Sequence, residues 1–275
     1  MRINNNVAAI NAQRNLLVTG MSLSKSVERL SSGLRINRAS DDAAGLSISE
    51  KLRSQIRGLA QATRNAQDGI SMIQTGEGAL TEVHNMLQRM RELSVQASND
   101  TLAASDRAAV NAELQALRAE VDAIRARTRF NGKNLLDGSV GAANLQIGPN
   151  AADTLSVAFP DVSIATLGLT GALDAFNLAQ TVANAQALIT AVDSAITSVS
   201  GTRSNLGAMQ NRLEYTIANL GVAYENMVAS ESRIRDADFA YETVQFTKAQ
   251  ILQQSGTAIL AQANALPQSV LTLLK

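Results

Sequence analysis

The chain has 275 residues, and its 24 Lys and Arg balance 24 Asp and Glu, so the formal net charge is zero. This balance argues against a general nucleic-acid binder, which needs a basic surface. The absence of cysteine excludes disulfides, zinc–thiolate sites and cysteine nucleophiles. Aromatic residues make up only 3%, and a hydrophobic content carried by Ala, Leu, Ile, Val and Met favours long packed helices.

The sequence indicates neither a membrane span nor a cleaved signal peptide. No run approaches the roughly 18 apolar residues that a spanning helix needs. Residues 1–6 are followed by no apolar signal-peptide centre. We therefore expect no membrane insertion, and either a cytoplasmic protein or export by a route that cleaves no signal.

The first predicted helix runs from about residue 3 to residue 34, where apolar residues recur in helical steps. This stripe comprises Val7, Ile10, Leu17, Met21, Val27, Leu30 and Leu34. The other faces carry Asn, Gln, Ser and Arg. Because so thin a stripe buries little apolar surface within one chain, this helix is expected to need a partner.

A polar break follows the first helix. Gly33 can end that helix in a left-handed conformation. The Ser40 hydroxyl can cap the next helix, and the carboxylates of Asp41 and Asp42 face the positive end of its dipole. Locally the stretch simply joins two helices; the alternative is a joint with a further role.

The dominant predicted element is a proline-free helix over residues 44–98. Its apolar stripe is Ile56, Leu59, Ala66, Ile70, Ile73, Leu80, Val83, Leu87 and Met90. A continuous helix of this length makes a rod, although Gly69, Gly76 and Gly78 each weaken it by up to about 1 kcal/mol relative to Ala. A shorter helix over 105–129 carries Val110, Leu114, Leu117, Val121 and Ile124 on one face.

Residues 131–160 have the pattern of a β-hairpin that begins with Asn-Gly and Asp-Gly turn signals. Two runs, 145–147 and 155–159, alternate apolar and polar residues around a turn with Gly and Pro. We expect residues 161–178 to form an irregular connection.

A third long helix is predicted over 179–235, followed by a polar interruption at 235–238 and a final amphipathic helix. The third helix carries Leu188, Val192, Ile196, Val199, Leu206, Leu213, Ile217, Leu220, Met227 and Ile234 on one face. The final helix has two seven-residue rows, Val244 with Ile251, and Leu252 with Ile259 and Leu266. Both ends of the chain are thus amphipathic helices joined to a longer helix by a polar interruption.

Catalytic and cofactor motifs find almost no support. His84 is the single histidine, and no Cys nucleophile or GxSxG turn accompanies it, so it is interpreted as a helix-surface residue. One histidine cannot form an HExxH zinc site, and the sequence has no phosphate-binding glycine loop. Asp236 and Asp238 are too sparse for an EF-hand and indicate a helix boundary. We expect no enzyme activity, no cofactor and no metal.

Several motifs resemble those of bacterial flagellins, for example Leu-Ser-Ser-Gly-Leu-Arg-Ile-Asn at 30–37. The matching segments are Asn11–Asn15, Arg29–Asn37, Asp41–Leu46, Gln88–Leu93, Leu206–Leu213, Ser232–Phe239, Ile251–Gly256 and Leu260–Leu271. They occur in the family's order and cover nearly the whole chain except about 161–185.

The resemblance implies a mainly α fold, an elongated, coiled-coil-like helical bundle with one small β-hairpin at about 130–160. It implies that residues 1–35 and 240–275 form an inner, tube-forming domain of two helices. Residues 36–239 are expected to form a rod domain of three long helices and the hairpin. Larger flagellins insert outer domains after the hairpin, and the short interval here predicts that this chain has none.

The stripes and the resemblance together assign three sets of residues. Polymerisation through the inner helices is assigned to Ile10, Leu17, Met21, Leu30, Ile251, Leu252, Ile259 and Leu266, for which the alternative is packing within one chain. The interdomain joint is assigned to Gly33, Asn37, Asp41, Asp42, Asp236 and Asp238. The resemblance alone assigns the surface by which an innate Toll-like receptor detects flagellins, to Arg89, Leu93, Glu113, Arg91 and Gln96. The alternative for Arg89 and Glu92 is an ordinary solvated helix face.

The implied function is a structural subunit that polymerises into the extracellular flagellar filament used for motility. Implied partners are other copies of the chain, an export chaperone that covers the carboxyl-terminal helix, hook-associated junction and cap proteins, and the receptor. Export through the flagellar apparatus, without a cleaved signal peptide, is expected. The alternatives are a non-polymerising coiled-coil adaptor and a hook–filament junction protein.

Overall fold

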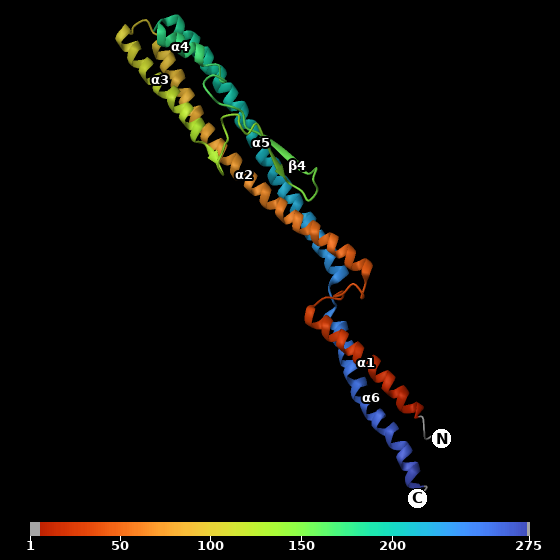
Figure 1. The fold of residues 1–275 in the computed structure, drawn as a ribbon. Coiled ribbons are helices and arrows are strands. Elements are labelled where there is room, and N and C mark those ends of the chain that lie inside the picture. Colours follow the sequence, from red (N-terminus) through yellow and green to blue (C-terminus); the bar gives the residue numbers. More distant parts are fainter. Residues whose placement is uncertain (1–5, 274–275) are drawn as a thin grey trace. The chain divides into compact units, whose positions relative to one another are not determined.

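A computed structural model describes the backbone of residues 6–273 and the side chains of residues 6–265. Over these residues the chain forms six helices and two small antiparallel sheets (Figure 1), which confirms the mainly α fold. The helices are α1 (Val7–Ser32), α2 (Ala43–Ala97), α3 (Ala104–Arg127), α4 (Thr170–Leu178), α5 (Val182–Arg235) and α6 (Phe239–Leu273). The strands are β1 (Arg129–Phe130), β2 (Lys133–Asn134), β3 (Ala142–Gln146) and β4 (Thr154–Ala158).

The chain divides into two compact units. The first comprises Met1–Ile56 with Glu225–Lys275, and the second comprises Arg57–Tyr224. The division falls inside α2 and α5, one or more turns beyond the polar interruptions that precede α2 and follow α5. Among the described residues, no helix is both long and apolar enough to cross a membrane.

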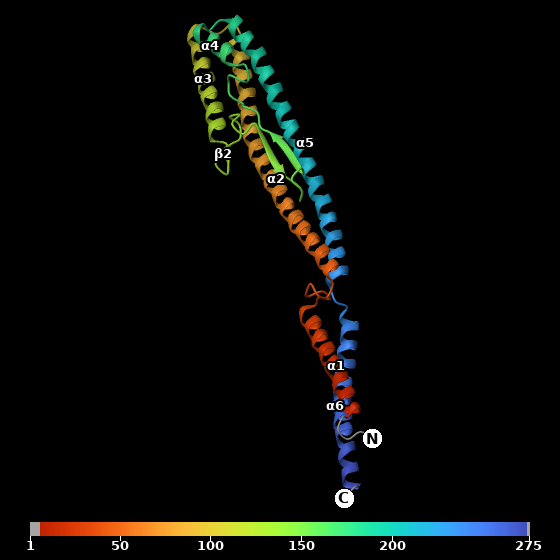
Figure 2. The same ribbon diagram turned by 45° about the vertical axis from the view of Figure 1, so that its right-hand side comes forward.

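The core of the second unit lies between α2, α3 and α5, which run side by side in Figures 1 and 2. Buried side chains from these helices include Ile73, Leu80, Val83, Leu87, Met90, Val110, Leu114, Val121, Leu188, Val192, Val199, Leu206 and Leu213. Every side chain predicted for the apolar faces of these three helices is buried or half-buried. Since each fully buried aliphatic side chain contributes about 1.5–3 kcal/mol, these faces account for much of the unit's stability.

The predicted β-hairpin is confirmed as β3 and β4, which pair from Ala142 opposite Ala158 to Gln146 opposite Thr154. Leu155 and Val157 are buried, whereas Thr154, Ser156 and Ala158 are exposed, as the period-two pattern requires. The hairpin packs on α2, where a Cβ on Gly69 would overlap the Leu145 side chain. Gly69 therefore interrupts no helix; it makes room for the hairpin.

A second, smaller hairpin joins β1 to β2. Phe130 pairs with Lys133, and the two residues between them, Asn131 and Gly132, both have positive φ, 48° and 78°. Positive φ at both central residues is typical of the two-residue turn that suits the twist of antiparallel strands. The Asn-Gly signal thus marks a hairpin of its own.

The prediction of an irregular connection over residues 161–178 is wrong for its second half, which forms α4. Leu173 and Phe176 of α4 are fully buried in the core of the second unit, as is Leu169 before it. Arg118 of α3 donates to Asp174 at 2.6 Å, and Asn111 donates to Asn177 at 2.7 Å. Packing against α3, rather than any strong local pattern, makes this short segment helical.

The residues before α4 are held by the Asp161 carboxylate. Burial raises the pKa of Asp161, but hydrogen bonds from Arg125, Thr166 and Ser163 outweigh it and lower the pKa overall. Arg125 Nε lies 2.7 Å from Asp161 Oδ1. This anchor fixes the start of the connection against the end of α3.

Candidate functional site

The two ends of the chain form a helix pair within the first unit. Near one end of the pair, the Asn6 side-chain amide donates to the Ala263 carbonyl at 2.7 Å. Near the other end, the Ser26 hydroxyl donates to Glu242 at 2.7 Å. Helices α1 and α6 therefore run antiparallel, side by side in Figures 1 and 2.

The contact between these helices follows a heptad pattern of mostly small residues. On α6 the row facing α1 is Glu242, Ala249, Gly256 and Ala263, spaced seven residues apart. A Cβ on Gly256 would lie 3.0 Å from Leu16 Cδ1, so the helices approach closely there. On α1 the buried or half-buried residues include Ala9, Ala12, Leu16, Thr19, Leu23, Ser26 and Leu30. Steps of three and four along α1 and of seven along α6 are typical of an antiparallel coiled coil.

The residues assigned to polymerisation lie mostly on other faces of this pair. Large apolar side chains remain exposed on both helices, including Ile10, Leu17, Met21, Ile251, Leu252 and Ile259, at 49–66% of their full exposure. The alternative, packing within one chain, is therefore wrong for these six residues. Leu30 is half-buried, and the side chain of Leu266 lies outside the described residues.

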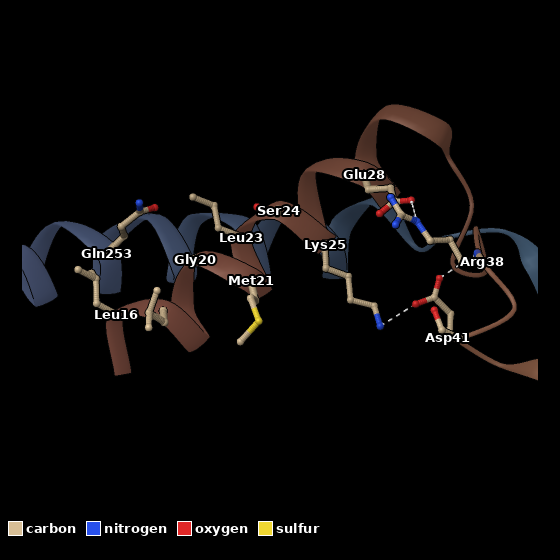
Figure 3. A pocket seen from close by; sticks show the side chains of 12 residues that line it. Leu16, Gly20, Met21, Leu23, Ser24, Lys25, Glu28, Arg38, Asp41 and Gln253 are labelled. Atoms are coloured by element: carbon tan, nitrogen blue, oxygen red, sulfur yellow. Dashed lines mark hydrogen bonds and ion pairs between the residues drawn. The ribbon is translucent and has the colours of Figure 1, made fainter. Parts of the chain in front are cut away.

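An open groove of about 800 Å³ runs along α1 beside the polar break (Figure 3). Leu16, Leu17 and Met21 line its apolar end. Two ion pairs close its other end, Lys25 Nζ to Asp41 at 2.8 Å and Arg38 Nε to Glu28 at 2.9 Å. The groove belongs to the same exposed apolar surface as the polymerisation residues of α1.

The two polar interruptions meet through backbone hydrogen bonds. Gly33 has φ of 72°, and its N–H donates to the Arg29 carbonyl at 2.8 Å, which ends α1. The Gly33 carbonyl accepts from Ala237 N–H at 2.9 Å, and Arg35 N–H donates to the Arg235 carbonyl at 2.6 Å. This short antiparallel bridge ties the segment just after α1 to the segment between α5 and α6 within the first unit.

The carboxylates assigned to the joint cap helices or fix turns. Asp42 accepts from Gly45 N–H at 2.8 Å, so Asp42 caps α2 and the expected cap at Ser40 is wrong. Asp238 accepts from the N–H groups of Ala240 and Tyr241, which caps α6. The remaining assigned residues bond locally: Asn37 donates to the Ser32 hydroxyl, and Asp236 accepts from the Ser232 hydroxyl.

Sequence reasoning missed the buried and charged support of this joint. Ile36 is only 1% exposed, although the residues around it are polar. Arg235 Nη1 lies 2.7 Å from Glu50 Oε1, and Arg53 lies 3.9 Å from Glu231. The sequence does not predict these ion pairs, because the two partners of each pair lie some 180 residues apart.

Acid should weaken the joint through two of its carboxylates. Lys25, then the backbone N–H groups of Arg38 and Asn37, lower the pKa of Asp41 to about 2, and Arg235 lowers the pKa of Glu50. Because both pKa values are depressed in the folded chain, the stabilisation is present above the unfolded values and is lost as pH falls, between about pH 5 and pH 1. Thermal unfolding followed by circular dichroism should show this loss, and Asp41→Asn should flatten it. An equally steep acid dependence in Asp41→Asn would contradict the assignment to Asp41.

Four of the five residues assigned to receptor recognition lie on the surface of the second unit. Arg89 lies between Glu113, at 2.8 Å, and Glu92, at 3.1 Å, and Arg91 donates to Asp193 of α5 at 2.6 Å. Gln96 is exposed. These pairs tie α2 to α3 on one side and to α5 on the other.

Leu93 does not belong with this surface. Its side chain is 2% exposed and packs in the core of the second unit. Leu93 lies seven residues after the half-buried Met86, on the face of α2 that packs in this core. A receptor contact by Leu93 therefore stays a prediction that the exposed charges around it do not share.

Long paired helices, a closed core and a terminal pair with exposed apolar faces are typical of a helical structural protein. Residues 3–141 match the family described as bacterial flagellin N-terminal helical region, and residues 189–274 match the bacterial flagellin C-terminal helical region. The chain belongs to the bacterial flagellin family.

Individual relatives agree with this membership. The chain is 53% identical over 275 residues to a flagellin of Halalkalibacterium halodurans, with 100% of both chains covered. It is 47% identical over 286 residues to the flagellar filament 33 kDa core protein of Treponema phagedenis, again covering 100% of both. The crystal structure of Bacillus cereus flagellin matches 57% of this chain and 88% of its own, with 32% identity and a TM-score of 0.50. The resemblance to flagellins is thereby confirmed.

Proposed function

We propose that this chain is the structural subunit of a flagellar filament and that copies of it assemble through the exposed apolar residues of α1 and α6. The observation that carries this proposal is the terminal helix pair, which closes on small residues and leaves its large apolar side chains exposed. The similarity to a flagellar filament core protein supports the same function.

The energetics favour burial of these faces by further copies. A pair of helices held by Ala249, Gly256 and Ala263 buries little apolar surface and is marginal by itself. Because these six large side chains are 49–66% exposed, each gains about 1–2 kcal/mol when another copy covers it, before the cost of association is subtracted. Repeated over many subunits, this gain sustains a polymer.

Seeded growth tests the proposal. Purified chain should lengthen short filament seeds above a critical concentration, as seen by electron microscopy and light scattering. Met21→Asp should raise that concentration at least tenfold, because it places a charge where about 1.5 kcal/mol or more of apolar burial is expected. Met21→Leu, which keeps an apolar side chain, is the matched control and should assemble like the parent.

The alternatives give different outcomes in the same experiment. A non-polymerising adaptor would leave the seeds unchanged at every concentration. A hook–filament junction protein would bind seed ends without lengthening them. Either result would overturn the proposed function.

The proposed organisation follows the family resemblance. Residues 1–35 with 240–275 are the inner, tube-forming domain, and residues 36–239 are the rod domain, with α4 in the short interval where larger flagellins carry outer domains. The finished filament lies outside the cell, and the chain reaches it through the flagellar export apparatus. It has a structural role and catalyses no reaction.

The same apolar faces are exposed before assembly, and a partner protein that binds them would keep them from water. Val244, Ile251 and Ile259 of α6 are each more than half exposed, which suits capture by a cytosolic export chaperone. At the filament ends the corresponding faces are left for hook-associated junction and cap proteins. These partners belong to the proposal together with self-assembly.

Receptor recognition is the second functional proposal, carried by the exposed charges around Arg89. Arg89→Asp reverses a charge that lies between Glu92 and Glu113, so it should abolish signalling by added monomer through the Toll-like receptor. Arg127→Asp, which reverses an exposed ion pair with Glu120 elsewhere on α3, should leave signalling intact. A reporter-cell assay measures both, and full signalling by Arg89→Asp would reject the proposal.

A further inference from the structure

The row of α6 that faces α1 cannot by itself fix how the two helices are aligned. Three of its four members, Ala249, Gly256 and Ala263, are small and spaced seven residues apart. A slip of one heptad replaces each of them with another small residue and changes the contact little. Repeating small rows of this kind specify close approach but leave several registers nearly equal in energy.

Glu242 is the exception in this row. It is 5% exposed, and its carboxylate accepts a hydrogen bond from the equally buried Ser26 hydroxyl at 2.7 Å. The other carboxylate oxygen lies 3.5 Å from Arg29 Nη1. Ser26 and Arg29 are three residues apart on α1, so both face one position on α6.

We infer that the contact of Glu242 with Ser26 and Arg29 is a register lock that determines which alignment of α1 and α6 is used in assembly. A slip of one heptad toward the amino end of α1 would place the carboxylate opposite Thr19, ten residues from Arg29. A slip the other way would place it opposite Gly33, beyond the last residue of α1, without the Ser26 hydroxyl. A buried carboxylate without its cation and hydrogen-bond donor is strongly unfavourable. The lock therefore acts mainly by penalising wrong alignments.

This role rests on the proposed filament, where many identical copies of α1 and α6 come together. Each α6 then meets several helices with the same small and apolar residues. A polar contact that occurs once per helix pair distinguishes the correct alignment from the others. Specificity and stability can be separated, because an apolar side chain in place of a buried ion pair often keeps the fold stable while the selection is lost.

Disulfide trapping can measure the alignment, since the natural chain has no cysteine. Thr19→Cys with Ala249→Cys places two thiols opposite each other in the observed register, in which Ser26 faces Glu242. Ala12→Cys with Ala249→Cys reports a slip of one heptad. Filaments of each pair are oxidised and dissociated in denaturant, and the intrachain and interchain products are then separated by electrophoresis without reductant.

In the otherwise natural chain only the Thr19 pair should cross-link efficiently. Glu242→Leu should raise the ratio of slipped to observed cross-links about tenfold or more, as expected from losing a hydrogen-bonded charge contact. Glu225→Leu, which removes an exposed carboxylate of the same unit, should leave the ratio unchanged. An unchanged ratio in Glu242→Leu filaments would overturn the lock.

The outcome for the lock is separable from that for filament formation. If Glu242→Leu does not assemble, Glu242→Gln, which keeps the shape and loses the charge, decides by the same ratio. If the parent itself forms no filament, the proposed function fails, and the intrachain ratio in the soluble chain still tests the lock. There too, an unchanged ratio in the variant would reject it.

Discussion

Gly33→Pro should abolish filament growth while leaving the unit formed by residues 57–224 folded. Gly33 has φ of 72°, whereas proline is fixed near −65°, so the backbone cannot keep its conformation at this position. The substitution also removes the Gly33 N–H, which donates to the Arg29 carbonyl at 2.8 Å. It displaces the Gly33 carbonyl, which accepts from the Ala237 N–H. We expect a local cost of about 3 kcal/mol or more, concentrated in the bridge between the two interruptions. Seeded growth and the helical circular dichroism signal measure the two effects.

Gly33→Ala is the graded control for this prediction. A Cβ at position 33 would meet no atom within 4 Å, so alanine adds only the penalty of a left-handed conformation, about 1–2 kcal/mol. Growth by Gly33→Ala should therefore be slowed but retained. Parent-like growth of Gly33→Pro would show that assembly does not depend on the observed geometry of this joint.

The long helices were predictable because burial and periodicity coincide there. In α2, α3 and α5 the large apolar residues recur at helical spacing and are the ones that face the core, as Leu80, Leu114 and Leu206 illustrate. Gly69 weakened the prediction of a continuous α2, because the reason for it is the Leu145 side chain of a hairpin remote in sequence. Such a contact leaves no local signal in the sequence.

The terminal helices show the opposite relation between pattern and packing. The strongest apolar stripe of α1, which includes Leu17 and Met21, stays exposed, while the contact with α6 uses half-buried Leu16 and Leu23. On α6 the contact row contains Glu242 and small residues, which a search for apolar periodicity passes over. An apolar stripe indicates that a helix face is stabilised by burial. It does not indicate whether the same chain or another copy buries that face.

Helix α4 was missed for a related reason. Its nine residues are too few to form a stable helix alone, and Gly168 and Gly171 near its start weaken the local pattern. Asp161 holds the preceding segment, and Asp174 and Asn177 are bonded by α3. The helical state of α4 is thus set by tertiary contacts that only the folded unit provides.

Phe176→Ala should destabilise the second unit by about 3–5 kcal/mol, the usual cost of truncating a fully buried phenylalanine. Phe176 of α4 is 0% exposed and packs in the same core as the long helices, so its loss leaves a cavity in that core. Urea unfolding of the whole chain, followed by circular dichroism, measures the effect. Leu178→Ala is the matched control, because Leu178 ends the same helix but is 90% exposed, and its effect should stay within about 0.5 kcal/mol.

The dependence on urea distinguishes two ways in which this prediction can fail. If α4 detaches locally instead of unfolding with the core, the slope of the unfolding free energy with urea should fall, because less surface remains to be exposed in the main transition. A loss below about 1 kcal/mol with an unchanged slope would mean that the core closes around the cavity, against the packing seen at Phe176. If the free energy of unfolding falls by the expected amount and the slope is that of the parent, α4 unfolds cooperatively with the unit. Its helical state then depends on tertiary contacts that no local sequence pattern predicts.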